Sequence, residues 1–331
     1  MKNNRGFKRV LKRIKEELKA TIEISRILTI KKALITLRAK FDIQIMVHNG
    51  RKEYDWIKRH LLKKHEVMNL FFDKIFDGFI PKIEENNSED KCENIWICWW
   101  QGRNNMPEIV KACLKSIEAF SGNHKVIVLT EENYKQYVEF PDWIQAKYKR
   151  GIISKTHLSD LLRFELLSKY GGIWLDSTFY CVGSLEKYFQ KRIWTIKRPD
   201  YRHTSVGCGQ FATYSLGCDF ENRYIFSYIK QYIYEYWKKY DYMIDYLFLD
   251  YLIVHAINNN DNVKKKFAEI EPNNFMCDEL LKRLGKAYNH EEWELLKDKT
   301  DLFKLSWKSI PQKEINDKKT FYGMLVNDNL K

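Results

Sequence analysis

Two aspartates and one arginine stand close together in one segment of this 331-residue sequence, KTHLSDLLRFELLSKYGGIWLDST at 155–178. Asp160 and Arg163 lie three residues apart on one face of a mostly apolar helix, which the leucine spacing predicts over 155–170. Charges on a buried helix need partners, so the two residues either pair with each other and nearby loops or contact a ligand. His157 lies three residues before Asp160 on the same side of the helix. It is either a hydrogen-bonding helix residue or a further contact to the ligand.

Asp176 directly follows a short apolar strand predicted at 173–175, which comes after a Gly-Gly pair that can end the helix. In a parallel sheet, a carboxylate at a strand end faces the ligand crevice. Asp176 and Thr178 share one side of an extended segment, so they can offer a carboxylate and a hydroxyl to Mn²⁺ or Mg²⁺. The alternative for Asp176 is a structural cap that holds a loop at the strand end.

Apolar runs at 95–100 and 126–129 predict two further buried strands, separated by a helix. The resulting β-α-β-α-α-β order predicts an α/β fold with a mostly parallel sheet flanked by helices. Trp99 and Trp100 would then lie at the same edge of the sheet as Asp176. Later segments predict strands at 194–196 and 206–214 and aromatic-rich helices at 219–239 and 242–257.

Basic residues are concentrated at the start of the chain. Of a formal net charge of +13, residues 1–40 carry +10, and the remainder is nearly neutral at +3. The apolar positions here follow helical spacing: Phe7, Val10, Leu11, Ile14 and Leu18. Such a basic amphipathic helix can lie on an anionic membrane, or it can dock its apolar stripe on the body of the protein. We expect no nucleic-acid partner, because the rest of the chain offers no basic groove or binding motif.

The organisation predicted is a basic helical N-terminal region at 1–83 with a break near 48–50, a polar linker at 84–91 and a globular domain at 92–331. No apolar stretch reaches the length of about 18 residues that a transmembrane helix needs, and the first residues lack a signal peptide's apolar segment. Seven cysteines without a C-x-x-C pair are typical of reduced thiols. We therefore expect a cytoplasmic protein, held peripherally at the inner face of the plasma membrane if the basic region binds lipid.

Five motifs between 95 and 185 carry a resemblance to a known family: IWICWWQG, MPEIVKACLKSI, HKVIVLT, ISKTHLSDLLRFELL and KYGGIWLDSTFY. They resemble the capsular polysaccharide synthesis glycosyltransferases, which are similar to the wider GT-A fold sugar transferases with a DxD motif and a preceding D-x-x-R helix. The later runs DYMIDYLFLDYLI and KTFYGML also resemble that family. The resemblance implies that 92–331 is a GT-A-like (Rossmann-like) domain. It also implies retaining transfer of a sugar from a nucleotide sugar, with UDP-sugars favoured, to a glycan or lipid-linked glycan acceptor.

The same resemblance implies roles for the charged residues. Asp176 would hold a divalent cation, Mn²⁺ or Mg²⁺, on the donor diphosphate, and Thr178 stands where the motif has its second aspartate. Asp160 would accept hydrogen bonds from sugar hydroxyls, and Arg163 would donate to the donor's phosphate or ribose. The phosphates would also attract Lys155 or Lys308. Trp99 or Trp100 would pack on the donor base, with a buried core position as the alternative for each.

Other candidate residues lie further along the chain. Asp245 and Asp250 fall in the predicted helix 242–257, where one could bind acceptor hydroxyls or orient the reacting group, or both could be helix-surface residues. Ser306, Trp307 and Lys308 resemble a C-terminal element that closes over the nucleotide in similar transferases, with a packed turn as the alternative. A different class of function also stays open because of Thr178: a non-catalytic membrane-surface scaffold or sugar-nucleotide-binding protein with a degenerate transferase body.

Overall fold

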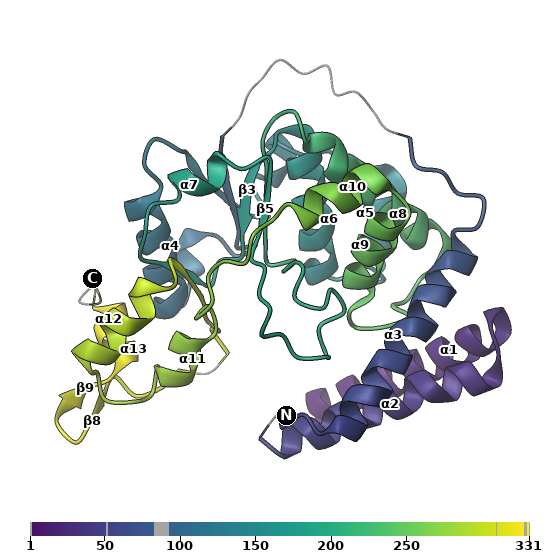
Figure 1. The fold of residues 1–331 in the computed structure, drawn as a ribbon, viewed down its shortest axis with the longest axis horizontal. Helices are drawn as coiled ribbons and strands as arrows, with labels where there is room; N and C mark the ends of the chain where they lie inside the picture. Colours follow the sequence, from purple (N-terminus) through teal and green to yellow (C-terminus); the bar gives the residue numbers. More distant parts are fainter. Residues whose placement is uncertain (1, 51, 83–92, 309, 328–329, 331) are drawn as a thin grey trace.

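A computed structural model describes residues 2–50, 52–82, 93–308, 310–327 and 330, with side chains described from residue 14 onward. The predicted linker at 84–91 lies outside the described residues. Figure 1 shows a central sheet with helices on both sides, the N-terminal helices grouped at one end of the molecule and the C-terminal helices at the other.

The central sheet has five strands, in the order β2 (Val126–Leu129), β1 (Ile95–Cys98), β3 (Gly172–Leu175), β6 (Ser215–Cys218) and β5 (Ile193–Thr195). β1 runs parallel to β2 and β3, whereas β6 runs antiparallel to β3 and β5. Four of these five strands therefore point in the same direction. The prediction of an α/β fold with a mostly parallel sheet is confirmed.

Alternating side chains of β1 face two separate apolar cores, as the two-residue period of a strand requires. Ile95 and Ile97 pack with helix α4 (Glu108–Phe120) on one face of the sheet. Trp96 points to the other face, into the core that contains helix α6 (Lys155–Lys169). Helix α6 begins after Ser154, whose hydroxyl accepts a hydrogen bond from the backbone N–H of His157 at 3.3 Å.

The remaining elements complete the body of the protein. The short helices before and after the third strand are η1 (Arg103–Asn105), η2 (Tyr134–Gln136), α5 (Asp142–Lys149) and α7 (Glu186–Phe189). The later helices are α8 (Arg223–Lys239), α9 (Phe248–Asn258), α10 (Asp261–Ala268), α11 (Glu279–Arg283), α12 (His290–Asp298) and α13 (Phe321–Val326). Two small antiparallel sheets pair β4 (Phe179–Cys181) with β7 (Leu302–Lys304), and β8 (Glu314–Ile315) with β9 (Lys318–Lys319).

Two of the predicted elements differ from the structure. The strand predicted at 206–214 is wrong: this segment is mostly turns, and the strand begins at Ser215. Cys208 and Gly209 have φ angles of 48° and 74°, which an extended strand does not allow. The second aromatic helix begins at Phe248, so the placement of Asp245 within it is also wrong.

The N-terminal region consists of α1 (Lys2–Ile27), α2 (Ile30–His48) and α3 (Asp55–Ile75). The predicted break near 48–50 is confirmed, and a second break occurs at Thr29, whose side chain caps α2. Helix α3 belongs to the same core as the body, because Phe71 and Phe72 are fully buried in one apolar cluster with Tyr251 of α9. Helices α1 and α2 extend from α3 at one end of the molecule (Figure 1).

Candidate functional site

The carboxyl ends of β1 and β3 meet at one edge of the sheet. The two strands are parallel neighbours, with Ile95 opposite Ile173 and Trp96 opposite Trp174. Asp176 follows β3, and Trp99 follows β1, so both lie at that edge despite their distance in sequence. This is the edge at which open α/β sheets bind ligands.

Asp176 is held by three side chains. Its Oδ1 accepts hydrogen bonds from Arg163 Nη2 at 3.3 Å and from Trp174 Nε1 at 3.1 Å. Its Oδ2 lies 3.2 Å from Lys304 Nζ, and 32% of the side chain remains exposed. Burial alone would raise the pKa of this carboxyl, but the positive charges of Lys304 and then Arg163 outweigh it and lower the pKa. Asp176 is therefore ionised at neutral pH and reachable from solvent.

Arg163 joins the two carboxylates that the sequence singles out. Its Nη2 lies 3.4 Å from Asp160 Oδ1 as well as 3.3 Å from Asp176, and its Nη1 donates to the carbonyl of Thr213. The guanidinium also lies over the ring of Trp174, 4.9 Å from its centroid. Because the side chain is only 6% exposed and fixed by these groups, Arg163 positions Asp160 and Asp176 relative to each other. A direct contact from Arg163 to phosphate stays a prediction.

Two further carboxyls near Arg163 have pKa values raised toward neutrality. Burial raises the pKa of Asp160 to about 7, with Arg163 opposing the shift and the charges of Asp176 and Asp250 adding to it. Burial likewise raises the pKa of Asp250, on α9, to about 6, against a hydrogen bond with Thr213 and the charge of Arg163. Carboxyls in this range can donate or accept a hydrogen bond to a hydroxyl at neutral pH.

Lys304 lies between the two residues predicted to bind a metal. Its Nζ donates to Thr178 Oγ1 at 2.6 Å and contacts Asp176 Oδ2 at 3.2 Å. As they lie here, one carboxylate and one buried hydroxyl, both already bound to an ammonium group, do not fit a divalent cation. Nor do the described residues contain a group of three or more His, Cys, Asp and Glu side chains that could hold a metal ion. The binding of Mn²⁺ or Mg²⁺ stays a prediction.

The tryptophans at the end of β1 have different environments. Trp99 contacts Trp307 edge to face, with ring centroids 5.8 Å apart, which brings the C-terminal segment 306–308 to the sheet edge. Trp307 is 45% exposed, and the backbone N–H of Lys308 donates to Ser306 Oγ at 3.3 Å. Trp100 is instead buried against α6. Trp100 therefore has the buried core position that was the alternative to a ligand contact. Packing of Trp99 on the donor base stays a prediction.

Two candidate residues make contacts with other parts of the molecule. The ring of His157 packs between Trp237 and Phe248, with centroid distances of 5.5 and 5.8 Å, where α6 meets α8 and α9. Asp245 is buried before α9, and its Oδ2 lies 2.9 Å from Lys64 Nζ of α3. It also lies 3.5 Å from a lysine of α2, so Asp245 ties the N-terminal helices to the body. A catalytic role for Asp245 stays a prediction.

Lys304 is the residue of this cluster that the sequence analysis did not identify. Of the lysines expected near phosphate, Lys155 forms an exposed ion pair with Glu131 at 2.5 Å, and Lys308 is exposed at the surface. One sequence feature could have identified Lys304: it is a charged residue within the apolar run LFKL at 302–305, and a charge in a buried strand needs a partner.

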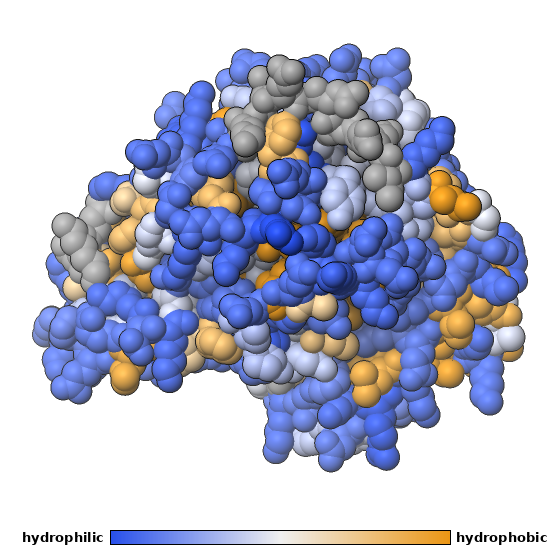
Figure 2. Space-filling model, turned by 45° about the horizontal axis from the view of Figure 1, so that its top comes forward, coloured by the Kyte–Doolittle hydropathy of each residue, from blue (hydrophilic) through white to orange (hydrophobic). Residues whose placement is uncertain are grey.

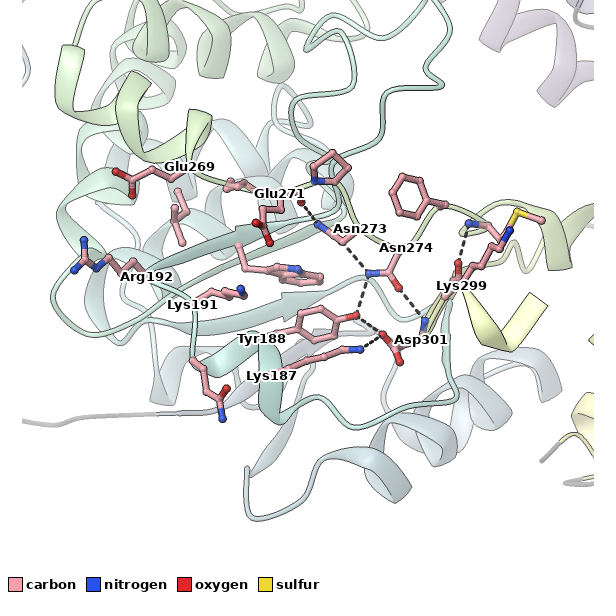
Figure 3. A pocket seen from close by; sticks show the side chains of 18 of the residues that line it. Lys187, Tyr188, Lys191, Arg192, Glu269, Glu271, Asn273, Asn274, Lys299 and Asp301 are labelled. Carbon is pink, nitrogen blue, oxygen red and sulfur yellow. Dashed lines mark hydrogen bonds and ion pairs between the residues drawn. The ribbon is translucent and has the colours of Figure 1, made fainter. Parts of the chain in front are cut away.

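A cavity of about 1210 Å³ lies elsewhere in the protein, lined by residues of the segments 187–194, 266–276 and 297–301 (Figure 3). Ile193 begins β5, which runs in the same direction as β3. β5 is the edge strand of the sheet and is separated from β3 by β6, so the cavity lies beside this edge strand, whereas Asp176 follows β3. Figure 3 shows Lys187 and Tyr188 directed at Asp301, and both bind its carboxylate, at 2.5 and 2.9 Å. Asn274 also binds both Tyr188 and the backbone N–H of Asp301, so these polar groups satisfy one another and the chemistry favours the edge with Asp176.

Comparison with known proteins gives one match. A family model described as capsular polysaccharide synthesis protein matches residues 49–325, a stretch from just before α3 into α13 that leaves α1 and α2 outside. No curated protein and no solved structure matched the chain. Because the match spans most of the sequence, the chain belongs to the capsular polysaccharide synthesis protein family.

Proposed function

We propose that this protein is a glycosyltransferase with a GT-A-like fold. It moves a sugar from a nucleotide-sugar donor, with UDP-sugars favoured, to a glycan or lipid-linked glycan acceptor in capsule synthesis. Membership of the family supports the role in capsule synthesis. The observation that carries the proposal is the ionised, solvent-reachable Asp176 at the carboxyl end of β3, bridged to Asp160 by Arg163.

The cluster can perform three tasks of such a transfer. The Trp99 and Trp307 rings offer apolar faces for the donor base, since aromatic side chains can stack on any nucleotide base. Asp160, 18% exposed and with a pKa of about 7, can exchange hydrogen bonds with sugar hydroxyls. The cationic groups near Asp176 stabilise the charge that develops on the leaving diphosphate, which is the main electrostatic demand of the reaction. Holding donor and acceptor together adds a second large contribution.

The direct test is the release of nucleotide from a panel of UDP- and GDP-sugars, with and without glycan acceptors. We expect turnover of at least one donor. If the folded protein binds none of the nucleotides and turns over none of the donors, the proposal is wrong.

A second function is favoured by one specific observation. Thr178 replaces the motif's second carboxylate, and its hydroxyl is occupied by Lys304. A sugar-nucleotide-binding protein or membrane scaffold with a degenerate transferase body would keep such a site without catalysis. This alternative predicts heat on titration with UDP but no turnover of any donor.

We also propose that α1 and α2 bind an anionic membrane surface at the cytoplasmic side. Large apolar side chains are exposed along one face of each helix: Ile14, Leu18 and Ile22 on α1, and Ile30, Leu34, Phe41 and Ile45 on α2. Exposed basic residues accompany them: Lys15, Lys19, Arg26, Lys31 and Arg38. Figure 2 shows apolar side chains at the surface on the side of the molecule where these helices lie.

The packing of the two helices supports this membrane proposal over docking alone. Small residues such as Ala20, Ala33 and Ala39 are buried where the N-terminal helices pack, which leaves the larger apolar side chains outside. An exposed apolar face flanked by basic residues is typical of interfacial binding. Phe7, Val10 and Leu11 lie outside the residues whose side chains are described. No helix in the described ranges has both the length and the apolar content to cross a bilayer.

A further inference from the structure

Lys304 is fixed in place by the strand that carries it. In the β4–β7 pair, Lys304 lies opposite Phe179, and its backbone N–H donates to the carbonyl of Cys277 at 2.8 Å. The next residue, Leu305, donates its N–H to the carbonyl of Thr178 at 2.9 Å. The side chain then passes along the rings of Phe179 and Tyr214, whose centroids lie 5.6 and 5.5 Å from Nζ. The strand pairing and the two aromatic rings therefore fix the position of the ammonium group.

This position is where a divalent cation would be needed in a metal-assisted transferase. In such an enzyme a strand-end carboxylate would hold the ion, which would supply positive charge to the leaving diphosphate. The ammonium group of Lys304 already contacts Asp176 and Thr178, and 20% of its side chain is exposed. An ammonium group has three N–H donors. With two directed at Asp176 and Thr178, the third is available for a phosphate oxygen.

We propose that Lys304 binds the donor diphosphate directly and takes the place of the divalent cation, so that donor binding does not require a metal. The inference rests on the proposed glycosyltransferase function. During transfer, the bond between the anomeric carbon and the diphosphate oxygen breaks, and its electron pair stays on that oxygen. The acceptor oxygen forms the new bond to carbon, and its proton passes to the released diphosphate. Lys304 stabilises the negative charge on the leaving group, as Asp176 holds the ammonium in place.

The neighbouring charges fit this assignment. Asp176 and Lys304 neutralise each other, and the charge of Arg163 is shared between Asp160 and Asp176. A divalent cation at Asp176 would have to displace Lys304 from this carboxylate and from the buried Thr178 hydroxyl. A phosphate oxygen, by contrast, can add to the ammonium without displacing either residue.

The test is titration calorimetry of the full chain with UDP and GDP, in EDTA and in Mn²⁺. The variants are Lys304→Met, which removes the charge but keeps the length, and Lys304→Arg, which keeps the charge. The control is Lys318→Met, because Lys318 is an exposed lysine of β9 to which no role in donor binding is assigned. Thermal unfolding of each variant establishes that it is folded.

We expect the parent to bind one of the two nucleotides in EDTA about as tightly as in Mn²⁺. Lys304→Met should lose roughly tenfold or more in affinity in EDTA, as expected when a charge-assisted hydrogen bond is removed. Lys304→Arg should retain most of the affinity, and Lys318→Met should match the parent. Binding by the parent only in Mn²⁺, or unchanged binding by Lys304→Met, would overturn the inference and leave the proposed function intact. Binding of neither nucleotide in either condition would instead overturn both.

Discussion

The rings of Trp99 and Trp307 meet edge to face, with their planes at 90° and their centroids 5.8 Å apart. Trp99 leaves the carboxyl end of β1, and Trp307 lies three residues after β7, close to the end of the chain. The contact brings the C-terminal segment to the same sheet edge as Asp176. Since Trp307 is 45% exposed, part of its ring is open to a ligand. We interpret the pair as the platform for the donor base.

Replacing Trp307 by alanine should weaken nucleotide binding. Stacking of one base on an aromatic ring contributes about 1 to 3 kcal/mol, so UDP affinity should fall by a corresponding factor in calorimetry. Phe275→Ala is a matched control, because Phe275 is 44% exposed and lines the separate cavity beside β5. Loss of affinity in Phe275→Ala but not in Trp307→Ala would place the nucleotide in that cavity and contradict our interpretation.

The titration of Asp160 predicts a pH dependence of stability. Burial raises its pKa from 3.8 to about 7, so between these pH values the folded chain binds more protons than the unfolded chain. The contribution of Asp160 to the free energy of unfolding therefore falls as the pH rises through this window. Asn resembles the protonated form, so the melting temperature of Asp160→Asn relative to the parent should rise between about pH 5 and pH 8.

The control for this experiment is Asp77→Asn, an exposed carboxylate at the end of α3. Its difference from the parent should stay constant over the same pH range. A constant difference for Asp160→Asn as well would show that Asp160 is ionised throughout, and the raised pKa would be wrong.

The N-terminal helices should bind vesicles in a charge-dependent way. Each basic residue near an anionic surface contributes about 1 kcal/mol, and the apolar face adds burial in the lipid interface. In flotation, the parent should bind phosphatidylserine vesicles and not neutral ones. Leu34→Ser combined with Phe41→Ser should abolish most of this binding.

Leu295→Ser combined with Ile310→Ser is the matched control for the membrane experiment, because these side chains are 68% and 64% exposed on the C-terminal part of the chain. The control should float like the parent. Equal binding of the parent to neutral vesicles would contradict the electrostatic account.

Several parts of the fold could be predicted from local patterns. The apolar runs of β1, β2 and β3 identified their strands, because a strand buried on both faces is apolar at every position. Helix α6 and its glycine ending were also predictable, since Ser154 and Gly171 provide ordinary caps. Together these elements predicted that Asp176 and Arg163 would lie near each other.

The parts that were missed depend on long-range packing. Nothing local to Lys304 indicates that β7 pairs with β4, and that pairing alone brings its ammonium to Asp176. The burial of Trp100 depends in the same way on a hydrogen bond to Ser159 of α6 at 2.7 Å. Asp245 was assigned to a helix because its neighbours are helical in pattern, whereas its ion pair with Lys64 holds it before that helix.

The central claim is that the ionised Asp176 organises the donor site, and donor turnover by Asp176→Asn tests it most directly. The substitution keeps the shape of the side chain and removes the charge that holds Lys304 and Arg163. We predict that the turnover of the nucleotide sugar falls by about 100-fold or more, the range seen when one electrostatic partner of a transition state is removed. Asp77→Asn should retain parental turnover. Parental turnover by a folded Asp176→Asn variant would contradict the account.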